Sequence, residues 1–382
     1  GDQVLSPEQV FKLKQANLTQ RTRSVLTSSL VRYWTMPINY SISPQVGFKG
    51  IIAIKGAIKF WEVSTCIRFK EYRYDDIKDS GTNFIHFFKG QGCFSGLGML
   101  GGQQGISVGY GCEFIGLVAH EIAHAFGVAH THQTYNRDDF IEVLWNNIKS
   151  GSDYKLNFFK LNPQHTNSYG TAYDLGSVMH YPASAFSVHN AVDTLKTLDT
   201  KYQETMGQRH HPSFIDVYQV NRAYCARECG QEALLPCSHG GYPNPNNCYE
   251  CICPSGFGGQ FCSDIQPSSG ICGGILEAKR NTWESLIYNN SYPSDPTTCY
   301  WQIKAPKGKK VEIEVQSGSR IVCTDACFYD YMEIKISSDK QKTGYRWCCY
   351  PPTNTIVAES NIVVVIAHTK TYNNFELKYR YN

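Results

Sequence analysis

The chain has 382 residues, with 36 Lys and Arg against 33 Asp and Glu, 16 Cys and a hydrophobic share of 42%. This length is typical of two or three domains, and the composition is that of a globular protein. A net charge of +3 without any basic run argues against a phosphate backbone as partner, so we predict no nucleic-acid binding. The longest apolar run of the C-terminal half, Ile362–Ala367, is far shorter than the ~20 residues that cross a bilayer, so no membrane span is expected.

The cysteines indicate an oxidising compartment. They are even in number and cluster toward the C-terminus, as is usual in extracellular proteins. The chain begins at Gly1 without Met or a signal-peptide pattern, so we expect that an upstream segment was removed or omitted. Three N-x-S/T triplets are candidate glycosylation sites, at Asn17, Asn39 and Asn289. We therefore predict a secreted, extracellular glycoprotein.

Cysteine spacing divides the chain into three units. Four widely spread cysteines fall in a long first unit, residues 24–225. Six more crowd into residues 226–265, a stretch so rich in Gly, Pro and Asn that disulfides must supply its stability. The last six lie in residues 268–382, and Ile265–Ser269 is predicted to be a linker.

Hydrophobic periodicity predicts the elements in chain order. Two helices are expected in the first unit, from apolar residues at helical spacing: Ile51, Ile54, Ile58 and Trp61, then Ile115, Val118, Ala119, Ile122 and Phe126. Between them we predict short strands at 64–72 and 83–88, which makes the first unit α+β. The last unit shows the alternation of half-buried strands at Val311–Val315, Tyr331–Ile336 and Phe375–Tyr379.

The second helix carries a metal-binding pattern. His120 and His124 lie one helical turn apart on a face roughly opposite the apolar one, and Glu121 lies about a quarter turn away. Gly127 permits a positive φ that ends the helix and returns His130 toward the same point. Three imidazoles and a water form a tetrahedral catalytic zinc site with one open position, in which Glu121 serves as general base.

Together with later residues, this pattern resembles a known family. The sequence H-E-x-x-H-x-x-G-x-x-H of residues 120–130, followed by Ser177-Val178-Met179-His180-Tyr181, is similar to the zinc helix and Met-turn of the astacin-family (metzincin) zinc metalloproteases. Further similarities cover the whole first unit, at residues 34–40, 65–69, 173–176, 207–209, 216 and 224–225. The resemblance implies an α+β metzincin catalytic domain, then a small disulfide-rich EGF-like module and an all-β CUB sandwich, an order typical of nematode astacins.

The resemblance also bears on single residues. Tyr181, two residues after Met179, is expected to be a fifth zinc ligand or an oxyanion donor, with simple packing as the alternative. Met179 itself is predicted to be structural, an apolar floor under the imidazoles. Arg137-Asp138-Asp139 is interpreted as a structural ion pair rather than a catalytic group. The remaining histidines are expected on the surface or in packing: His132, His180, His189, His210 and His211.

Most disulfides follow from the resemblance. It implies the pairs Cys66–Cys225, Cys93–Cys112, Cys229–Cys248, Cys237–Cys251, Cys253–Cys262 and Cys272–Cys299. The pairing of Cys323, Cys327, Cys348 and Cys349 stays open. Calcium in the CUB segment is uncertain, because Ala367-His368-Thr369 stands where the family often has a ligating Asp.

Residues 1–23 are predicted to be a propeptide remnant. The basic cluster Arg21-Thr22-Arg23 follows a polar stretch that a protease can reach, so a zymogen cut is expected there. The resemblance implies that a propeptide blocks the open zinc position and that the new N-terminus docks inside the domain. Thr131 stands where the family usually has the contacting Glu, so another carboxylate or hydrogen bonds alone would anchor the terminus.

The predicted function is that of a secreted zinc endopeptidase acting on extracellular proteins or peptides, with cuticle and matrix proteins as candidate substrates. The first alternative is a zinc-bearing but inactive adhesion or matrix-binding protein that works through its EGF-like and CUB modules. It is disfavoured because the base and all three ligands are intact. The second is a structural disulfide-rich matrix protein without zinc. Metal analysis of the purified protein would distinguish it from a zinc enzyme.

Overall fold

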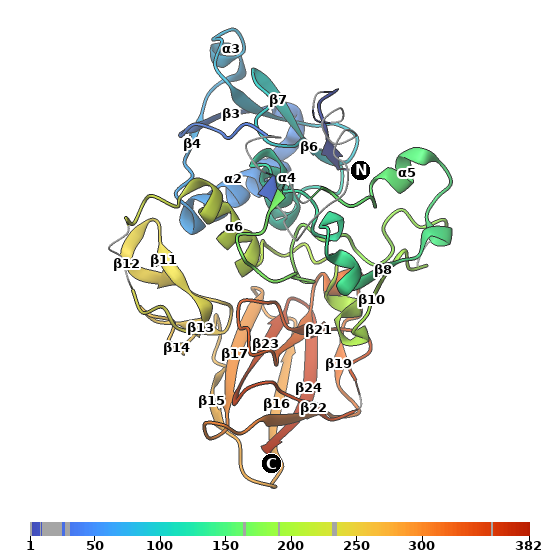
Figure 1. The fold of residues 1–382 in the computed structure, drawn as a ribbon, viewed down its shortest axis with the longest axis vertical. Coiled ribbons are helices and arrows are strands. Elements are labelled where there is room, and N and C mark those ends of the chain that lie inside the picture. The colour runs from blue at the N-terminus through green and yellow to red at the C-terminus, as the bar shows by residue number, and fades with distance from the viewer. Residues whose placement is uncertain are drawn as a thin grey trace.

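The structure is a computed structural model that describes residues 2–7, 9, 25–26, 31–162, 166–189, 192–230, 235–352 and 354–382. Asn17 and the predicted cleavage region Arg21–Arg23 lie outside these residues. Three units follow one another along the chain: an N-terminal unit up to Cys225, a middle unit up to Ile265 and a C-terminal unit (Figure 1). In the described part of the chain, no helix combines the length and apolarity that a membrane crossing requires.

The N-terminal unit is built on a six-stranded sheet. Its strand order is β1 (Gln3–Val4), β6 (Cys93–Gly96), β7 (Gln103–Val108), β5 (Phe84–Phe88), β3 (Ile38–Ile42) and β4 (Phe69–Glu71). β6 runs antiparallel to β7, whereas β7, β5, β3 and β4 are parallel. The predicted strand at 64–72 was too long, because helix α2 continues to Ser64 and pairing begins only at Phe69.

Two long helices, α2 (Gly47–Ser64) and α4 (Ile115–Ala125), pack together in the core of this unit. Trp61 of α2 is fully buried and donates its indole N–H to the carbonyl of Ala119 (3.2 Å). The predicted apolar face of α4 is correct except at Ile115, which is 43% exposed. Ile115 begins the helix, and its side chain packs on one side against Gly56 of α2. At the other end Gly127 has φ +93°, so the helix ends where the sequence predicted.

Shorter elements complete the N-terminal unit. The regular ones are β2 (Val25–Leu26), α3 (Tyr74–Ile77), β8 (Ile141–Val143), α5 (Ser152–Leu156), β9 (Thr166–Asn167), β10 (Leu195–Thr197) and α6 (Phe214–Tyr224). The 3-10 turns are η1 (Pro44–Val46), η2 (Thr131–Gln133), η3 (Arg137–Asp139), η4 (Trp145–Asn147) and η6 (Thr200–Thr205). Ser213 and Asp216 form a capping box at the start of α6, which fixes the direction of this helix.

The described residues of the middle unit are held by three disulfides and two small ladders. These are β11 (Tyr242–Asn244) with β12 (Asn247–Ile252), and β13 (Phe257–Gly258) with β14 (Asp264–Ile265), next to a 3-10 turn η7 (Ser238–Gly240). The predicted linker at 265–269 is not free chain. Ile265 pairs within β14, and Ser269 donates its N–H to the carbonyl of Thr298.

The C-terminal unit is a sandwich of two five-stranded sheets. One sheet has the order β15 (Gly274–Glu277), β17 (Thr297–Lys304), β23 (Ile362–Thr369), β20 (Tyr331–Lys335) and β21 (Tyr345–Trp347). The other comprises β16 (Glu284–Ser291), β24 (Tyr372–Tyr381), β18 (Val311–Val315), β22 (Ile356–Val357) and, paired with β24, β19 (Arg320–Ile321). A 3-10 turn η8 (Asp325–Cys327) precedes β20.

Strand β20 differs from the prediction that it is half-buried. β18 and β24 alternate between buried and more accessible residues as expected, but all five residues of β20 are buried. Its outer face is covered by the other two units. Lys335 donates to the Ser255 carbonyl of the middle unit (3.1 Å). Glu333 is paired with Arg346 (2.9 Å), and the backbone N–H of Arg346 donates to the Thr205 hydroxyl of the N-terminal unit.

Candidate active site

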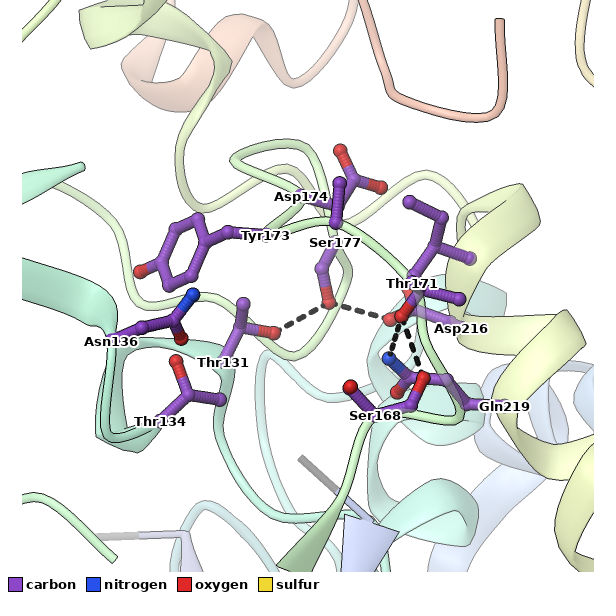
Figure 2. Close-up of a pocket in the computed structure, with 12 residues that line it drawn as sticks. Thr131, Thr134, Asn136, Ser168, Thr171, Tyr173, Asp174, Ser177, Asp216 and Gln219 are labelled. Carbon is purple, nitrogen blue, oxygen red and sulfur yellow. Dashed lines mark hydrogen bonds between the residues drawn. The ribbon is translucent and has the colours of Figure 1, made fainter. Parts of the chain in front are cut away.

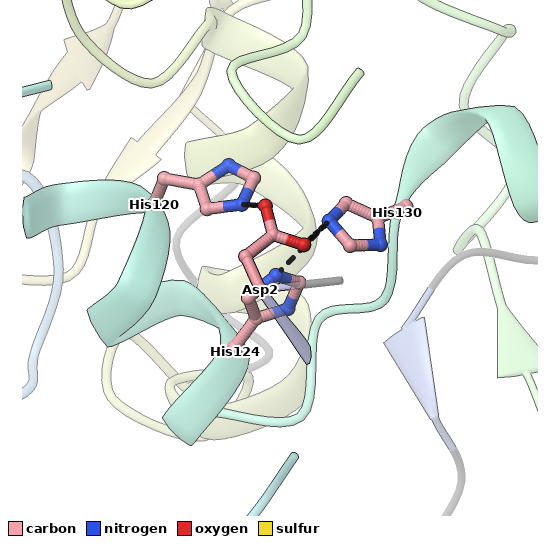
Figure 3. Close-up of side chains that lie close together, drawn as sticks. All are labelled: Asp2, His120, His124 and His130. Carbon is pink, nitrogen blue, oxygen red and sulfur yellow. Dashed lines mark hydrogen bonds and ion pairs between the residues drawn. The ribbon is translucent and has the colours of Figure 1, made fainter. Parts of the chain in front are cut away.

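Three histidine side chains converge on one point of the N-terminal unit (Figure 3). His120 and His124 come from α4, and His130 follows the Gly127 turn; all three are at most 1% exposed. Nδ1 of His120 lies 2.8 Å from the carbonyl of Val178, and Nδ1 of His124 lies 2.8 Å from that of Val128. Because a carbonyl only accepts, each Nδ1 carries the proton and each Nε2 turns a lone pair toward the centre.

This arrangement fits zinc. Nε2 of His124 and Nε2 of His130 are 3.2 Å apart, and the converging ligand atoms lie within 4.8 Å of one another. Burial lowers the pKa of His120 to about 4 and the pKa of His124 well below its usual range, so both rings are neutral. Neutral imidazoles whose other nitrogen is held by a backbone carbonyl are the usual ligands of catalytic zinc.

Asp2 supplies a fourth ligand-type atom that the sequence reasoning missed. Its carboxylate lies 3.2 Å from His120 Nε2 and 3.0 Å from His130 Nε2, and it accepts a hydrogen bond from the Tyr181 hydroxyl (3.2 Å). Burial acts to raise the pKa of Asp2, but His130 and His120 together hold it well below its usual range. No motif or periodicity around Asp2 indicates this role in the sequence.

The short strand β1 holds Asp2 in place. β1 pairs parallel with β6, with Gln3 opposite Ser95 and Val4 opposite Gly96. Ser95 donates its N–H to the carbonyl of Asp2 (2.8 Å), and Leu97 donates to that of Val4 (3.1 Å). The N-terminal segment therefore occupies the edge of the sheet and places its carboxylate among the imidazoles at the same time.

Glu121 and Tyr181 lie beside the cluster. Glu121 is 2% exposed, and its Oε2 has no hydrogen-bond partner among the described residues. Burial raises the pKa of Glu121 well above its usual range, and the charge of Asp2 adds to the rise. Burial also raises the pKa of Tyr181, so its hydroxyl is a proton donor. The Tyr181 ring lies 4.4 Å from the His130 ring, centroid to centroid.

The other predicted residues lie around this centre. Met179 is fully buried in the main core. Arg137 pairs with Asp138 (3.0 Å) and donates to the His132 carbonyl (2.9 Å), a structural arrangement. No further histidine joins the cluster among the described residues: His132 and His180 are buried in packing, and His189, His210 and His211 lie elsewhere.

The six disulfides implied by the resemblance are present in the structure. The four cysteines left open pair as Cys323–Cys349 and Cys327–Cys348. Of the described glycosylation candidates, Asn289 is exposed on the edge strand β16, whereas Asn39 is half-buried in the interior strand β3. A glycan is therefore better accommodated at Asn289.

Comparison with known families assigns most of the chain. Residues 26–225 match the family model of astacin, a peptidase family. The match includes His120, His124 and His130 but not Asp2. The chain belongs to the astacin family. Residues 272–379 match the CUB domain, in agreement with the sandwich of the C-terminal unit.

Individual astacin-family relatives extend the likeness across all three units. Zinc metalloproteinase nas-36 of Caenorhabditis briggsae is 39% identical over 377 residues, which are 96% of this chain and 59% of the relative. Zinc metalloproteinase nas-30 of Caenorhabditis elegans is 38% identical, over 94% of this chain and 46% of its own length. The chain thus spans about half the length of these relatives. Among solved structures, the hatching enzyme zinc-protease high choriolytic enzyme 1 of Oryzias latipes is 30% identical, covers 53% of this chain and 98% of its own, and has a TM-score of 0.46.

Thr131, which stands where the family usually has Glu, belongs to a series of hydrogen-bonded side chains (Figure 2). Thr131 donates to the Ser177 hydroxyl (2.8 Å), which donates to Asp216 (2.6 Å). Asp216 also accepts the N–H of Val178 (2.9 Å). These side chains border a cavity of about 30 Å³. Burial, with a contribution from Asp174, raises the pKa of Asp216 to about 6.

The carboxylate of Asp330, in the loop before β20, forms its hydrogen bonds within the CUB domain. Asp330 is fully buried, and its carboxylate accepts the N–H groups of Lys370 (2.7 Å) and Thr371 (2.8 Å) and the Thr371 hydroxyl. His368, from the segment that replaces the family's usual Asp, contacts the Thr298 hydroxyl (2.9 Å). The Asp330 carboxylate thus helps to close its own loop.

A substitution of Asp2 tests whether this residue blocks the site. In the uncut, zinc-loaded chain, Asp2→Ala removes the carboxylate that competes for the cluster, so a small hydroxamate should bind about tenfold tighter or more. Asp75→Ala, on the exposed helix α3, is the control and should leave hydroxamate affinity unchanged. Equal affinity for the Asp2→Ala and unmodified chains, measured by titration calorimetry, would contradict the blocking role.

Proposed function

We propose that the chain is a secreted, zinc-dependent endopeptidase that cleaves extracellular proteins or peptides. The observation that carries this proposal is the buried cluster of His120, His124 and His130, with Glu121 beside it and a sheet edge next to it. Membership of the astacin family supports it, and so do relatives named zinc metalloproteinases.

The edge of β6 favours an extended peptide as substrate. In the uncut chain its N–H groups at Ser95 and Leu97 bind the backbone of β1. Once β1 leaves, the same groups are free to hold a substrate backbone by strand addition. Such binding recognises the main chain and leaves selectivity to side-chain contacts, which suits an endopeptidase.

The chain's own residues divide the chemistry. Zinc bound by the three histidines would supply a Lewis acid at the scissile carbonyl and make water a stronger nucleophile. Glu121 takes the proton of the attacking water and passes it to the leaving amine. The Tyr181 hydroxyl donates a hydrogen bond to the oxyanion that develops as the carbonyl is attacked. Burial of all these groups excludes bulk water and strengthens each interaction.

The chain is proposed to be made as a zymogen. The position of Asp2 in the cluster supports a blocked state before processing. After a cut near Arg21–Arg23, the new N-terminus enters the cavity beside Thr131. Asp216, with Asp174 nearby, then offers the carboxylate that Thr131 lacks.

Several features support an extracellular location and role. All 16 cysteines are in disulfides, which persist in oxidising compartments. The three disulfides and small ladders of the middle unit support an EGF-like module, which with the CUB domain would offer surfaces for protein contacts. Cuticle and matrix proteins are the proposed substrate class. The alternative of an inactive adhesion protein is disfavoured because Glu121 and Tyr181 are both in place at the cluster.

The role of Glu121 predicts a specific loss. Glu121→Gln should retain zinc but reduce peptide hydrolysis by about a hundredfold to ten-thousandfold, because an amide cannot accept the proton of water. Turnover of a quenched-fluorescent peptide and zinc content by atomic absorption measure the two effects. Glu113→Gln, a change in the loop before α4, should behave like the parent chain, and 1,10-phenanthroline should abolish activity in both. Near-normal turnover by Glu121→Gln would sink the assigned mechanism.

The role of Tyr181 predicts an effect on the chemical step. Tyr181→Phe should lower kcat by about 10- to 100-fold with little change in KM, because the hydroxyl acts on the developing oxyanion. Tyr135→Phe, outside the cluster, is the matched control. If kcat is unchanged in steady-state kinetics, Tyr181 serves only in packing.

The zymogen proposal predicts where the active form begins. N-terminal sequencing of the active secreted protein should find a start within or just after Arg21–Arg23, and replacing both arginines by Gln should leave the chain latent. A fully active form that starts upstream of Gln15 would show that the cut lies elsewhere.

A further inference from the structure

The CUB domain is bonded to the catalytic domain by side chains that reach across the junction in both directions. Glu204 of the catalytic domain accepts three consecutive backbone N–H groups, of Cys348, Cys349 and Tyr350 (2.8 to 2.9 Å). Asp199 accepts the Tyr345 hydroxyl (2.6 Å). These contacts end on the segment around η6, and neither Glu204 nor Asp199 belongs to the histidine cluster.

One contact of this junction differs, because it leads to the active site. Thr343 of the CUB domain donates its N–H and its hydroxyl to the two carboxylate oxygens of Asp174, both at 3.1 Å. Asp174 is 2% exposed and lies directly before the Met-turn. A Cβ on Gly176 would lie within 2.5 Å of Thr343 side-chain atoms, so the close approach requires glycine at this position.

Asp174 in turn shapes the segment that follows it. Its carboxylate accepts the N–H of Gly176 (3.2 Å), and its carbonyl accepts that of Ser177 (3.1 Å), which closes a tight turn. The Ser177 hydroxyl then accepts the N–H of Met179 (3.0 Å). Thr343 therefore holds the residue from which the Met-turn starts.

The Met-turn touches both elements that carry the histidines. The Val178 carbonyl fixes His120 through its Nδ1 (2.8 Å), and the Met179 carbonyl accepts the N–H of Thr131, next to His130 (3.0 Å). Tyr181 follows two residues later. Four successive contacts thus connect the CUB domain to a histidine of the cluster.

We propose that Thr343 of the CUB domain is a positioning residue of the active site. By holding Asp174, it sets the Met-turn that orients His120 and presents Tyr181. The CUB domain is then a part of the catalytic apparatus as well as a surface for partners. The expected change in kcat rests on the proposed function, whereas the expected change in zinc retention does not.

The test compares two hydroxyl deletions at the same junction. Thr343→Val and Tyr345→Phe each remove one hydroxyl that donates to a carboxylate of the catalytic domain, but only the first carboxylate leads to the Met-turn. Thr343→Ser keeps the hydroxyl and should rescue. Kinetics are measured in the chain after the cut near Arg21–Arg23, and zinc release to a chelator is measured in the uncut chain. The thermal midpoint is measured in both.

Thr343→Val is expected to lower kcat by about threefold to tenfold with KM changed less than twofold, and to speed zinc release by a similar factor, since one hydrogen bond to a buried carboxylate is lost. Tyr345→Phe and Thr343→Ser should leave both quantities within twofold. Equal effects of Thr343→Val and Tyr345→Phe, or no effect of Thr343→Val on zinc release, would overturn the proposal. If the chain cut near Arg21–Arg23 cleaves no peptide at all, the proposed function fails, while zinc release still decides the role of Thr343.

Discussion

The structure depends on turning three imidazole lone pairs toward one point inside a protein core. A buried lone pair without a partner is costly, and three that face one another are stable only around a cation. The fold creates this arrangement by holding the opposite ring nitrogens of His120 and His124 on backbone carbonyls. Residues outside the set of three histidines are therefore essential: Gly127 turns the chain at Val128, and Asp216 holds the Val178 peptide.

The sequence predicted the parts of the site that are local. His120, Glu121, His124, Gly127 and His130 fall within eleven residues, so helical geometry alone brings them together. Tyr181 and Met179 were found only because they resemble a family pattern. Asp2 was missed, since its contact with His120 spans 118 positions and depends on a two-residue strand that no periodicity reveals.

The fold shows the same division between local and distant signals. Alternation in Val311–Val315 and Phe375–Tyr379 reports one buried face correctly, because these strands face solvent on the other side. In Tyr331–Lys335 the same alternation misleads, because Glu333 and Lys335 are polar and yet buried. Lys335 donates to Ser255 of the middle unit, and Glu333 pairs with Arg346 of its own sheet. The units expected from cysteine spacing contact one another through such buried polar residues in this structure.

In the proposed zymogen, the covalent attachment of Asp2 has a consequence for how inhibition is released. A tethered carboxylate competes for the cluster at an effective concentration set by its connecting chain, in the millimolar range for short flexible connections, and dilution does not weaken it. One peptide-bond cleavage between Val4 and Val25 makes Asp2 part of a separate peptide, whose described contacts include the two-residue ladder of β1 and the contacts of Asp2 with His120, His130 and Tyr181. Such a peptide no longer competes at a tethered effective concentration, so dilution then favours the release of inhibition without any change of fold.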